Sequence, residues 1–302
     1  MTIVIDSNER QSIIFEEFLA QLDKRLDPTC HESMVAASDN LKALANNRTF
    51  LSDIITLEIK NFSDSQNNNT YVPPVVMLDA NPEKNYFVRA NLWPSTSDQI
   101  LKSSGDEAFS FNAPHDHNFN FLTVGYFGPG YWSDYYEYES VDVIGYPGEK
   151  VKLNFVERSA LSLGKIMLYR AGLDVHSQLP PDSFSISLNI MERTARQLVQ
   201  NQYYFDVKSG RIQSIVSPNS FICLLTLASA AGGPNSLDLL DHVIKKHPNP
   251  RVRFGALKAL SSGLSSAGEK SRTMEAGISD SSDFVREATR LELTRLESTW
   301  NS

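Results

Sequence analysis

The hydrophobic pattern of this 302-residue chain changes its period near residue 71 and again near residue 217. Between these points lie short runs rich in β-branched and aromatic residues, separated by Gly, Pro, Asp and Ser and without helical patterns between them. They are VVMLDA, NYFVRANLW, VDVIGY, KVKLNFVE, KIMLYRA and SFSISLNI, and YYFDVKSGRIQSIVS adds a hairpin with Ser209 and Gly210 in its turn. Strands of this length and spacing indicate an antiparallel sandwich or barrel over residues 71–216.

Helical patterns flank this β region on both sides. On the N-terminal side they cover residues 8–26, Ser33–Ala45 and Thr49–Ile59. On the C-terminal side they cover Asn219–Ala230, Ser236–Lys246, Arg251–Ser262 and Ser282–Leu296. We predict an α+β protein in three parts: an N-terminal helical flank (1–70), an antiparallel β-barrel (71–216) and a C-terminal helical region (217–302).

Two C-terminal helices begin alike. PRVRFGAL (Pro250–Leu257) and DFVREATR (Asp283–Arg290) each place a Val-Arg pair after a polar turn, 33 residues apart. This spacing resembles HEAT-type helical repeats, while a small helical bundle packed on the barrel explains it equally well. Either arrangement would form a separate layer, which could dock a protein partner or a second copy of the chain.

Composition excludes several classes of function. The formal net charge of −8 argues against a nucleic-acid partner, because phosphate contacts need clustered Lys and Arg. The N-terminus lacks the basic and apolar regions of a signal peptide, and no apolar run is long enough to cross a membrane. Cys30 and Cys223 are far apart in sequence. We therefore expect a cytoplasmic protein without a membrane partner.

One stretch, Ala113–Glu139, carries the strongest chemical signal. His115 and His117 are two residues apart at the mouth of a predicted strand, where side chains at i and i+2 share a face. The following residues predict a hairpin, with strands Phe119–Phe127 and Tyr131–Tyr138. The many aromatic side chains of this hairpin should fill the barrel interior, and some should line a pocket above a metal held by the histidines.

His176 follows another strand-like run (Lys165–Tyr169) and a loop. Three imidazoles at one point, with coordination positions left open, would form a catalytic metal site. A His-x-His pair alone is a weak signal, because strands carry histidines for ordinary reasons.

This arrangement of His115, His117 and His176 resembles the cupin family, over roughly residues 75–195. The resemblance implies a jelly-roll barrel with these three histidines as metal ligands; a metal-free barrel is the alternative. Many cupins add a glutamate ligand shortly after the His pair, but Phe121 and Leu122 occupy those positions here. The site would then have three histidines, unless Glu137 or Glu139 folds back to it. Three neutral imidazoles suit Fe(II), although Zn(II) and Ni(II) are chemically possible.

Among cupins, the pattern is most similar to the three-histidine thiol dioxygenases, the cysteine dioxygenase type. In the segment Tyr86–Leu92, Arg89 matches the family's arginine that holds the substrate carboxylate. An ordinary strand arginine, exposed at the surface or paired in a salt bridge, is an equally good interpretation of Arg89. The family's Ser-His-Tyr relay would fall on Ser187, Asn189 and Met191, so its imidazole and phenol are missing. The cysteine that some members cross-link to tyrosine would fall near Leu122. Cysteine is therefore a doubtful substrate.

From these residues we expect an Fe(II)-dependent oxygenase that combines O2 with a small, amino-acid-like substrate. Arg89, Ser187 and Asn189 are its candidate catalytic residues. The 2-oxoglutarate oxygenases rank lower, because they require an acidic residue where His117 stands. A non-enzymatic cupin that binds a ligand, or serves as a scaffold with a partner-docking helical tail, is the rival interpretation.

Overall fold

The computed structural model describes residues 3–61, 66, 69, 74–216 and 220–300. The described chain divides into two compact units. The first comprises residues 1–139, 150–194 and 202–213, and the second comprises residues 140–149, 195–201 and 214–302. The sequence-predicted boundaries at 70/71 and 216/217 lie on or beside positions outside the described residues.

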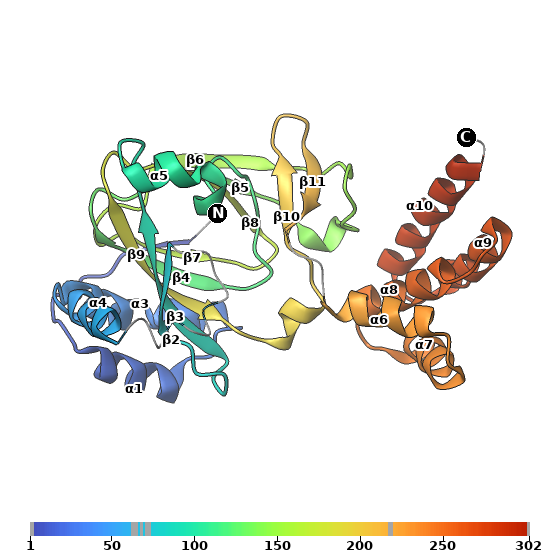
Figure 1. Ribbon diagram of the computed structural model, residues 1–302, viewed down its shortest axis with the longest axis horizontal. Helices are drawn as coiled ribbons and strands as arrows, with labels where there is room; N and C mark the ends of the chain where they lie inside the picture. Colours follow the sequence, from blue (N-terminus) through green and yellow to red (C-terminus); the bar gives the residue numbers. More distant parts are fainter. Residues whose placement is uncertain (1–2, 62–65, 67–68, 70–73, 217–219, 301–302) are drawn as a thin grey trace. The chain divides into compact units, whose positions relative to one another are not determined.

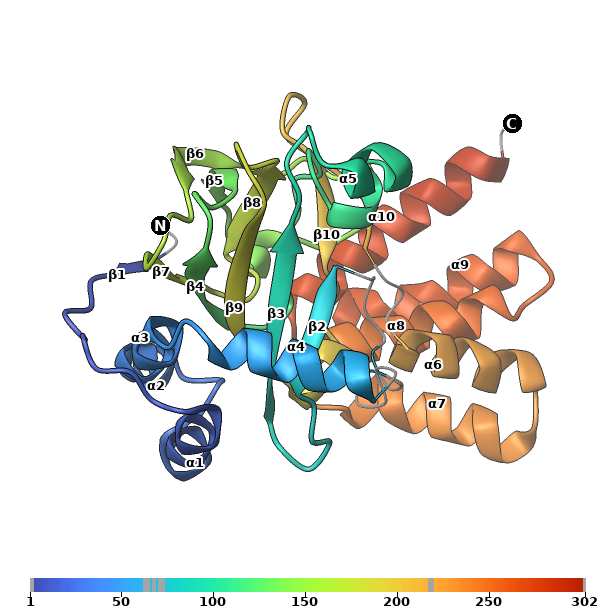
Figure 2. The same cartoon turned by 60° about the vertical axis from the view of Figure 1, so that its left-hand side comes forward.

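The first unit contains the two larger sheets of the described chain (Figures 1 and 2). A six-stranded antiparallel sheet has the order β1-β7-β4-β9-β3-β2, and a three-stranded sheet has the order β6-β5-β8. The strands are β1 (Ile3–Ile5), β2 (Val75–Asp79), β3 (Tyr86–Trp93), β4 (Phe121–Phe127), β5 (Trp132–Glu137), β6 (Asn154–Ala160), β7 (Ile166–Tyr169), β8 (Asp174–Leu179) and β9 (Ser185–Glu192). The predicted hairpin near Gly210 is confirmed as β10 (Tyr203–Asp206) paired with β11 (Arg211–Ile215).

Four N-terminal helices gather on one face of the six-stranded sheet (Figure 2). They are α1 (Phe15–Arg25), α2 (His31–Ala36), α3 (Ser38–Asn46) and α4 (Phe50–Lys60). Alternation along the strands explains this packing, because Val88 and Ala90 of β3 and Leu188 and Ile190 of β9 all point toward the helices. The N-terminal helices thus complete one hydrophobic core with the sheet.

The other face of the six-stranded sheet contributes to a second, aromatic core. Phe87, Phe121, Tyr169 and Met191 of the large sheet share this core with Tyr135 of the small one. Helix α5 (Gln99–Ser104) and a 3₁₀ turn (Asp106–Phe109) add Leu101 and Phe109. Helices, large sheet and small sheet therefore form three layers, with the aromatic core between the two sheets.

The α+β, antiparallel class is confirmed. The described strands form separate sheets and no closed barrel. The predicted hairpin of the aromatic stretch is wrong for a related reason: β4 pairs with β7 and β9, whereas β5 pairs with β6 and β8. The turn between them crosses from one sheet to the other. Gly128 and Gly130 have φ of 75° and 86°, and a Cβ on Gly130 would lie 1.9 Å from the Leu161 carbonyl oxygen.

Two further strand predictions need correction. The run VDVIGY forms no strand but a 3₁₀ turn (Ser140–Asp142) and a loop, in which the Glu149 carboxylate accepts hydrogen bonds from the backbone N–H groups of Ile144 and Gly145. His176, placed after a loop by the sequence, lies inside strand β8. That strand was missed because its buried positions include Asp174, Ser177 and Gln178, which hide the hydrophobic alternation.

The second unit is helical: α6 (Ser220–Ala231), α7 (Pro234–Lys246), α8 (Pro250–Ser262), α9 (Ala267–Glu275) and α10 (Asp283–Trp300). Helix α9, absent from the sequence prediction, begins with a capping box at Ser266 and Glu269. No described helix is long and apolar enough to cross a membrane.

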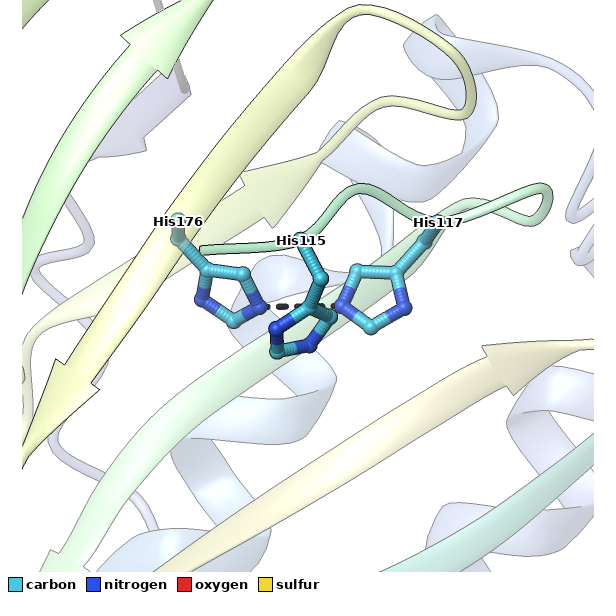
Figure 3. Close-up of side chains that lie close together, drawn as sticks. All are labelled: His115, His117 and His176. Carbon is cyan, nitrogen blue, oxygen red and sulfur yellow. Dashed lines mark hydrogen bonds between the residues drawn. The ribbon is translucent and has the colours of Figure 1, made fainter. Parts of the chain in front are cut away.

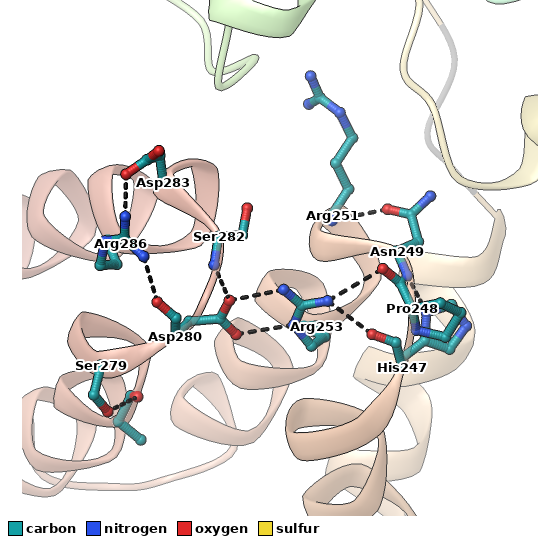
Figure 4. Close-up of polar contacts among 11 residues, drawn as sticks. His247, Pro248, Asn249, Arg251, Arg253, Ser279, Asp280, Ser282, Asp283 and Arg286 are labelled. Atoms are coloured by element: carbon teal, nitrogen blue, oxygen red, sulfur yellow. Dashed lines mark hydrogen bonds and ion pairs between the residues drawn. The ribbon is translucent and has the colours of Figure 1, made fainter.

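The arginines of the two Val-Arg pairs in the helical unit bind the same residue, Asp280 (Figure 4). Val252 and Val285 are each 1% exposed. Arg253 binds both carboxylate oxygens of Asp280, at 2.9 and 2.7 Å, and Arg286 donates to the Asp280 backbone carbonyl. The pairs therefore tie two helix starts to one aspartate, while assignment to HEAT-type repeats stays a prediction.

Candidate metal centre

The His-x-His segment runs as an extended stretch between β8 and β10. His115 exchanges backbone hydrogen bonds with His176, at 3.0 and 2.9 Å, and Phe205 donates its N–H to the Pro114 carbonyl. Asp116, between the two histidines, accepts hydrogen bonds from the Tyr203 N–H and the Tyr138 hydroxyl. This anchoring fixes the segment, so that His115 and His117 can share the opposite face.

The three predicted histidines converge (Figure 3). Their ring centroids are 4.6 to 5.1 Å apart, and one candidate ligand atom from each lies within 4.8 Å of the other two. The Nε2 atoms of His117 and His176 are 2.9 Å apart. Two ligands about 2.1 Å from one ion and at right angles to each other would lie about 3.0 Å apart. The cluster therefore has the spacing of a metal site.

Neighbouring groups select which ring nitrogen can bind a metal. His115 Nδ1 lies 2.7 Å from the Ala113 carbonyl oxygen, so Nδ1–H donates there and Nε2 keeps its lone pair. His117 Nδ1 lies 3.3 Å from the side-chain amide of Gln202. A half-turn of that amide lets its oxygen accept from Nδ1–H, which again leaves Nε2 free. These contacts are the outer hydrogen bonds that orient imidazole ligands.

Electrostatics keep the imidazoles neutral. Burial lowers the pKa of His115. Burial also lowers the pKa values of His117 and His176 well below 6.5, and repulsion from a neighbouring protonated imidazole, joined at His117 by Arg89, adds to this. A neutral imidazole offers the lone pair that a metal needs. The cluster is therefore ready to bind a cation at neutral pH without first releasing protons.

Aromatic rings surround the three histidines. Phe121 stacks on Tyr169, with ring centroids 4.2 Å apart, and the Tyr169 ring lies 4.7 Å from that of His176. The Tyr169 hydroxyl donates to Tyr135 at 3.1 Å and lies 3.5 Å from the Tyr131 hydroxyl. Burial raises the pKa of Tyr131 to about 12, so its hydroxyl stays protonated. The walls are thus apolar, with a group of phenol donors.

Arg89, Ser187 and Asn189 all lie on the strand positions that face the aromatic core. Arg89 is 9% exposed on β3, and its positive charge contributes to lowering the pKa values of His117 and Tyr131. Ser187 accepts a hydrogen bond from Trp93 Nε1 at 2.9 Å, and Asn189 accepts one from the Thr123 hydroxyl at 2.6 Å. Arg89 thus lies within electrostatic reach of the site, whereas the other two make structural contacts.

No carboxylate joins the histidines within the described part of the chain. Glu137 binds Arg170 at 2.7 Å, and Glu139 is exposed. Sequence reasoning missed two polar neighbours, Gln202 and Gln178. The position of Gln178, two residues after His176, was the one signal that could have revealed it.

Comparisons with known proteins find no matching family model and no matching curated protein. Among solved structures, three similar ones are a hydroquinone 1,2-dioxygenase from Sphingomonas sp. TTNP3, an RmlC-like cupin from Ralstonia eutropha JMP134 and a prolyl 4-hydroxylase from Phytophthora capsici.

The dioxygenase has 11% identity and a TM-score of 0.26, covering 42% of this chain and 70% of its own. The cupin has 12% identity and a TM-score of 0.20, covering 49% and 69%. The hydroxylase has 9% identity and a TM-score of 0.23, covering 91% and 83%. At these scores the similarities carry no argument about activity, so the function must be argued from the site.

Proposed function

We propose that this chain is a metal-dependent oxygenase, in which His115, His117 and His176 hold a non-haem Fe(II) ion that acts with O2 on a small, amino-acid-like substrate. The single observation that carries the proposal is the convergence of three buried imidazoles, with His117 and His176 Nε2 2.9 Å apart. Neutral imidazole ligands leave the full charge of a divalent ion in place. When bound, Fe(II) supplies the redox chemistry that a reaction with O2 requires.

The residues around the histidines have separate tasks in this proposal. Arg89 binds a substrate carboxylate, because its guanidinium can donate two parallel hydrogen bonds and its charge already acts on His117. Phe121 and Tyr169 exclude water from the space beside the imidazoles. The protonated Tyr131 hydroxyl is a hydrogen-bond donor for a polar substrate group. Ser187 and Asn189 support the inner face of the sheet through Trp93 and Thr123.

Oxygen uptake tests the proposal directly. Full-length protein, prepared anaerobically and loaded with Fe(II), is mixed with O2 and a panel of amino acids and thiols. We expect substrate-dependent O2 consumption that is lost in the His115→Ala/His117→Ala variant and in protein loaded with Zn(II). Saturable binding of a panel compound to the Fe(II) protein without O2 consumption would favour the non-enzymatic alternative.

A further inference from the structure

Gln178 places a polar group at the imidazole cluster that the three-histidine description leaves out. It follows His176 by two residues on β8, so both side chains project from the same face. The side-chain amide nitrogen lies 3.4 Å from His176 Nε2, and that ring atom lies 2.9 Å from His117 Nε2. Gln178 is 5% exposed, so its amide is held inside the protein beside the histidines.

The amide oxygen of Gln178 has no hydrogen-bond partner among the described residues and is buried. Such an oxygen loses its hydration without gaining a bond, which costs free energy. His176 Nδ1, in the adjoining ring, is also buried and has no hydrogen-bond partner in the described part of the chain. The orientation with the amide nitrogen toward His176 therefore leaves the Gln178 oxygen unsatisfied.

A half-turn of the Gln178 amide exchanges its nitrogen and oxygen without changing the space that the side chain fills. The oxygen then faces His176 Nε2 at the position now held by the nitrogen, 3.4 Å away. Two ligands of one ion, each roughly 2.1 Å from it, lie about 3.0 to 3.4 Å apart for right-angled or tetrahedral arrangements. The Gln178 oxygen can therefore share an ion with His176.

We propose that Gln178 Oε1 is a fourth protein ligand of the metal, an inference that rests on the proposed three-histidine site. The ligand set is then three imidazoles and one carboxamide oxygen, all neutral. An ion that takes six ligands would keep positions for substrate and O2. An oxygen donor among imidazoles suits Fe(II) and Mn(II) better than Cu(I), which prefers soft sulfur ligands.

Co(II) titration of the full-length protein tests this assignment, because the visible spectrum of bound Co(II) reports its ligands and coordination number. Gln178→Leu removes the oxygen and keeps the apolar volume, whereas Gln178→Glu keeps an oxygen at the same reach. We expect Gln178→Leu to weaken Co(II) binding ~10-fold and to change the spectrum. We expect Gln178→Glu to bind more tightly than wild type, with a spectrum shifted by the charged oxygen.

Gln213→Leu is the matched control, because Gln213 is an exposed glutamine on β11. It should leave the Co(II) spectrum like that of wild type. The assignment is overturned if Gln178→Leu keeps both the wild-type affinity and spectrum. Should Gln178→Leu fail to fold, as judged by circular dichroism, an unchanged spectrum in Gln178→Glu overturns it instead. A wild-type protein that binds no Co(II) would contradict the metal site itself, which is a separate failure.

Discussion

The imidazole cluster of the first unit and the Arg253–Asp280 cluster of the second are both largely buried and polar, yet they differ in how their atoms are satisfied. Arg253 makes four hydrogen bonds, two to Asp280 and two to the carbonyls of His247 and Pro248 (Figure 4). In the imidazole cluster, His176 Nδ1 and Gln178 Oε1 have no hydrogen-bond partner among the described residues.

This difference separates a structural cluster from a binding site. A satisfied buried pair holds elements in place, and breaking it is costly. Buried groups without partners make the fold less stable, so their presence indicates a role other than stability. The two clusters should therefore respond in opposite ways to substitution.

The largest expected effect on stability comes from Asp280→Ala. It leaves Arg253, whose side chain is 11% exposed, without its carboxylate. We expect the helical unit to lose about 3 kcal/mol of unfolding free energy, measured by urea denaturation, with metal binding unchanged. Asp241→Ala is the control, because its pair with Lys245 is exposed and should contribute about 0.5 kcal/mol or less. Equal effects from the two variants would contradict the structural role of the buried pair.

Arg89→Ala tests whether Arg89, near the imidazole cluster, binds substrate. Loss of a charge-assisted contact to a carboxylate should raise KM about 10- to 100-fold while the bound metal stays stoichiometric. Steady-state kinetics and metal analysis of the same preparation measure both quantities. Arg158→Ala, which removes an exposed guanidinium paired with Asp134, should change neither. Metal loss on substitution of Arg89 would show that this residue supports the site and does not recognise substrate.

His176→Leu should change the unfolding free energy in the opposite direction from Asp280→Ala. In metal-free protein it replaces an imidazole whose Nδ1 lacks a partner, so we expect a gain of about 1 kcal/mol in unfolding free energy together with loss of metal binding. His31→Leu provides the contrast, since His31 Nε2 lies 3.2 Å from the buried Asn120 amide oxygen. That variant should be less stable than wild type. A metal-free His176→Leu protein that is less stable than wild type would contradict the distinction between a structural cluster and a binding site.

The smallest expected effect is a pH dependence of the helical unit. Hydrogen bonds from Arg253 lower the pKa of Asp280 below its ordinary value of 3.8. The unfolded state therefore binds this proton first as the pH falls. The stabilisation from the ionised carboxylate is fully present above pH 3.8 and is lost as the pH falls through the lowered value. Urea denaturation near pH 3 and pH 6 should show a smaller pH difference in Asp280→Asn than in wild type.

The sequence predicted the α+β class and the antiparallel strands because alternation and turn residues are local signals. It also predicted the convergence of His115, His117 and His176, which the structure contains; their metal-binding role stays a prediction. The sequence did not predict that the chain crosses from the large sheet to the small sheet after β4. A Gly-Pro-Gly turn is common to hairpins and to crossings, and the close approach to Leu161 that distinguishes them involves distant residues.

The polar parts of the site were the hardest to predict. The sequence of β8 indicates a loop, because the buried residues His176, Ser177 and Gln178 are all polar. Gln202 lies 85 residues from His117 in the sequence, so only the tertiary fold reveals its contact. The core of the C-terminal helices shows a similar limit, because Leu225 and Leu240 are buried whereas the neighbouring Leu224 and Leu239 are exposed.

The measurement that tests the central claim most directly is the metal content of anaerobically purified full-length protein, compared with the His115→Ala/His117→Ala variant. We expect close to one divalent ion per wild-type chain after Fe(II) loading and removal of excess metal, and almost none in the variant, with circular dichroism showing both folded. Wild-type protein that retains no metal, or a variant that retains as much as wild type, would contradict the assignment of these imidazoles as a metal site.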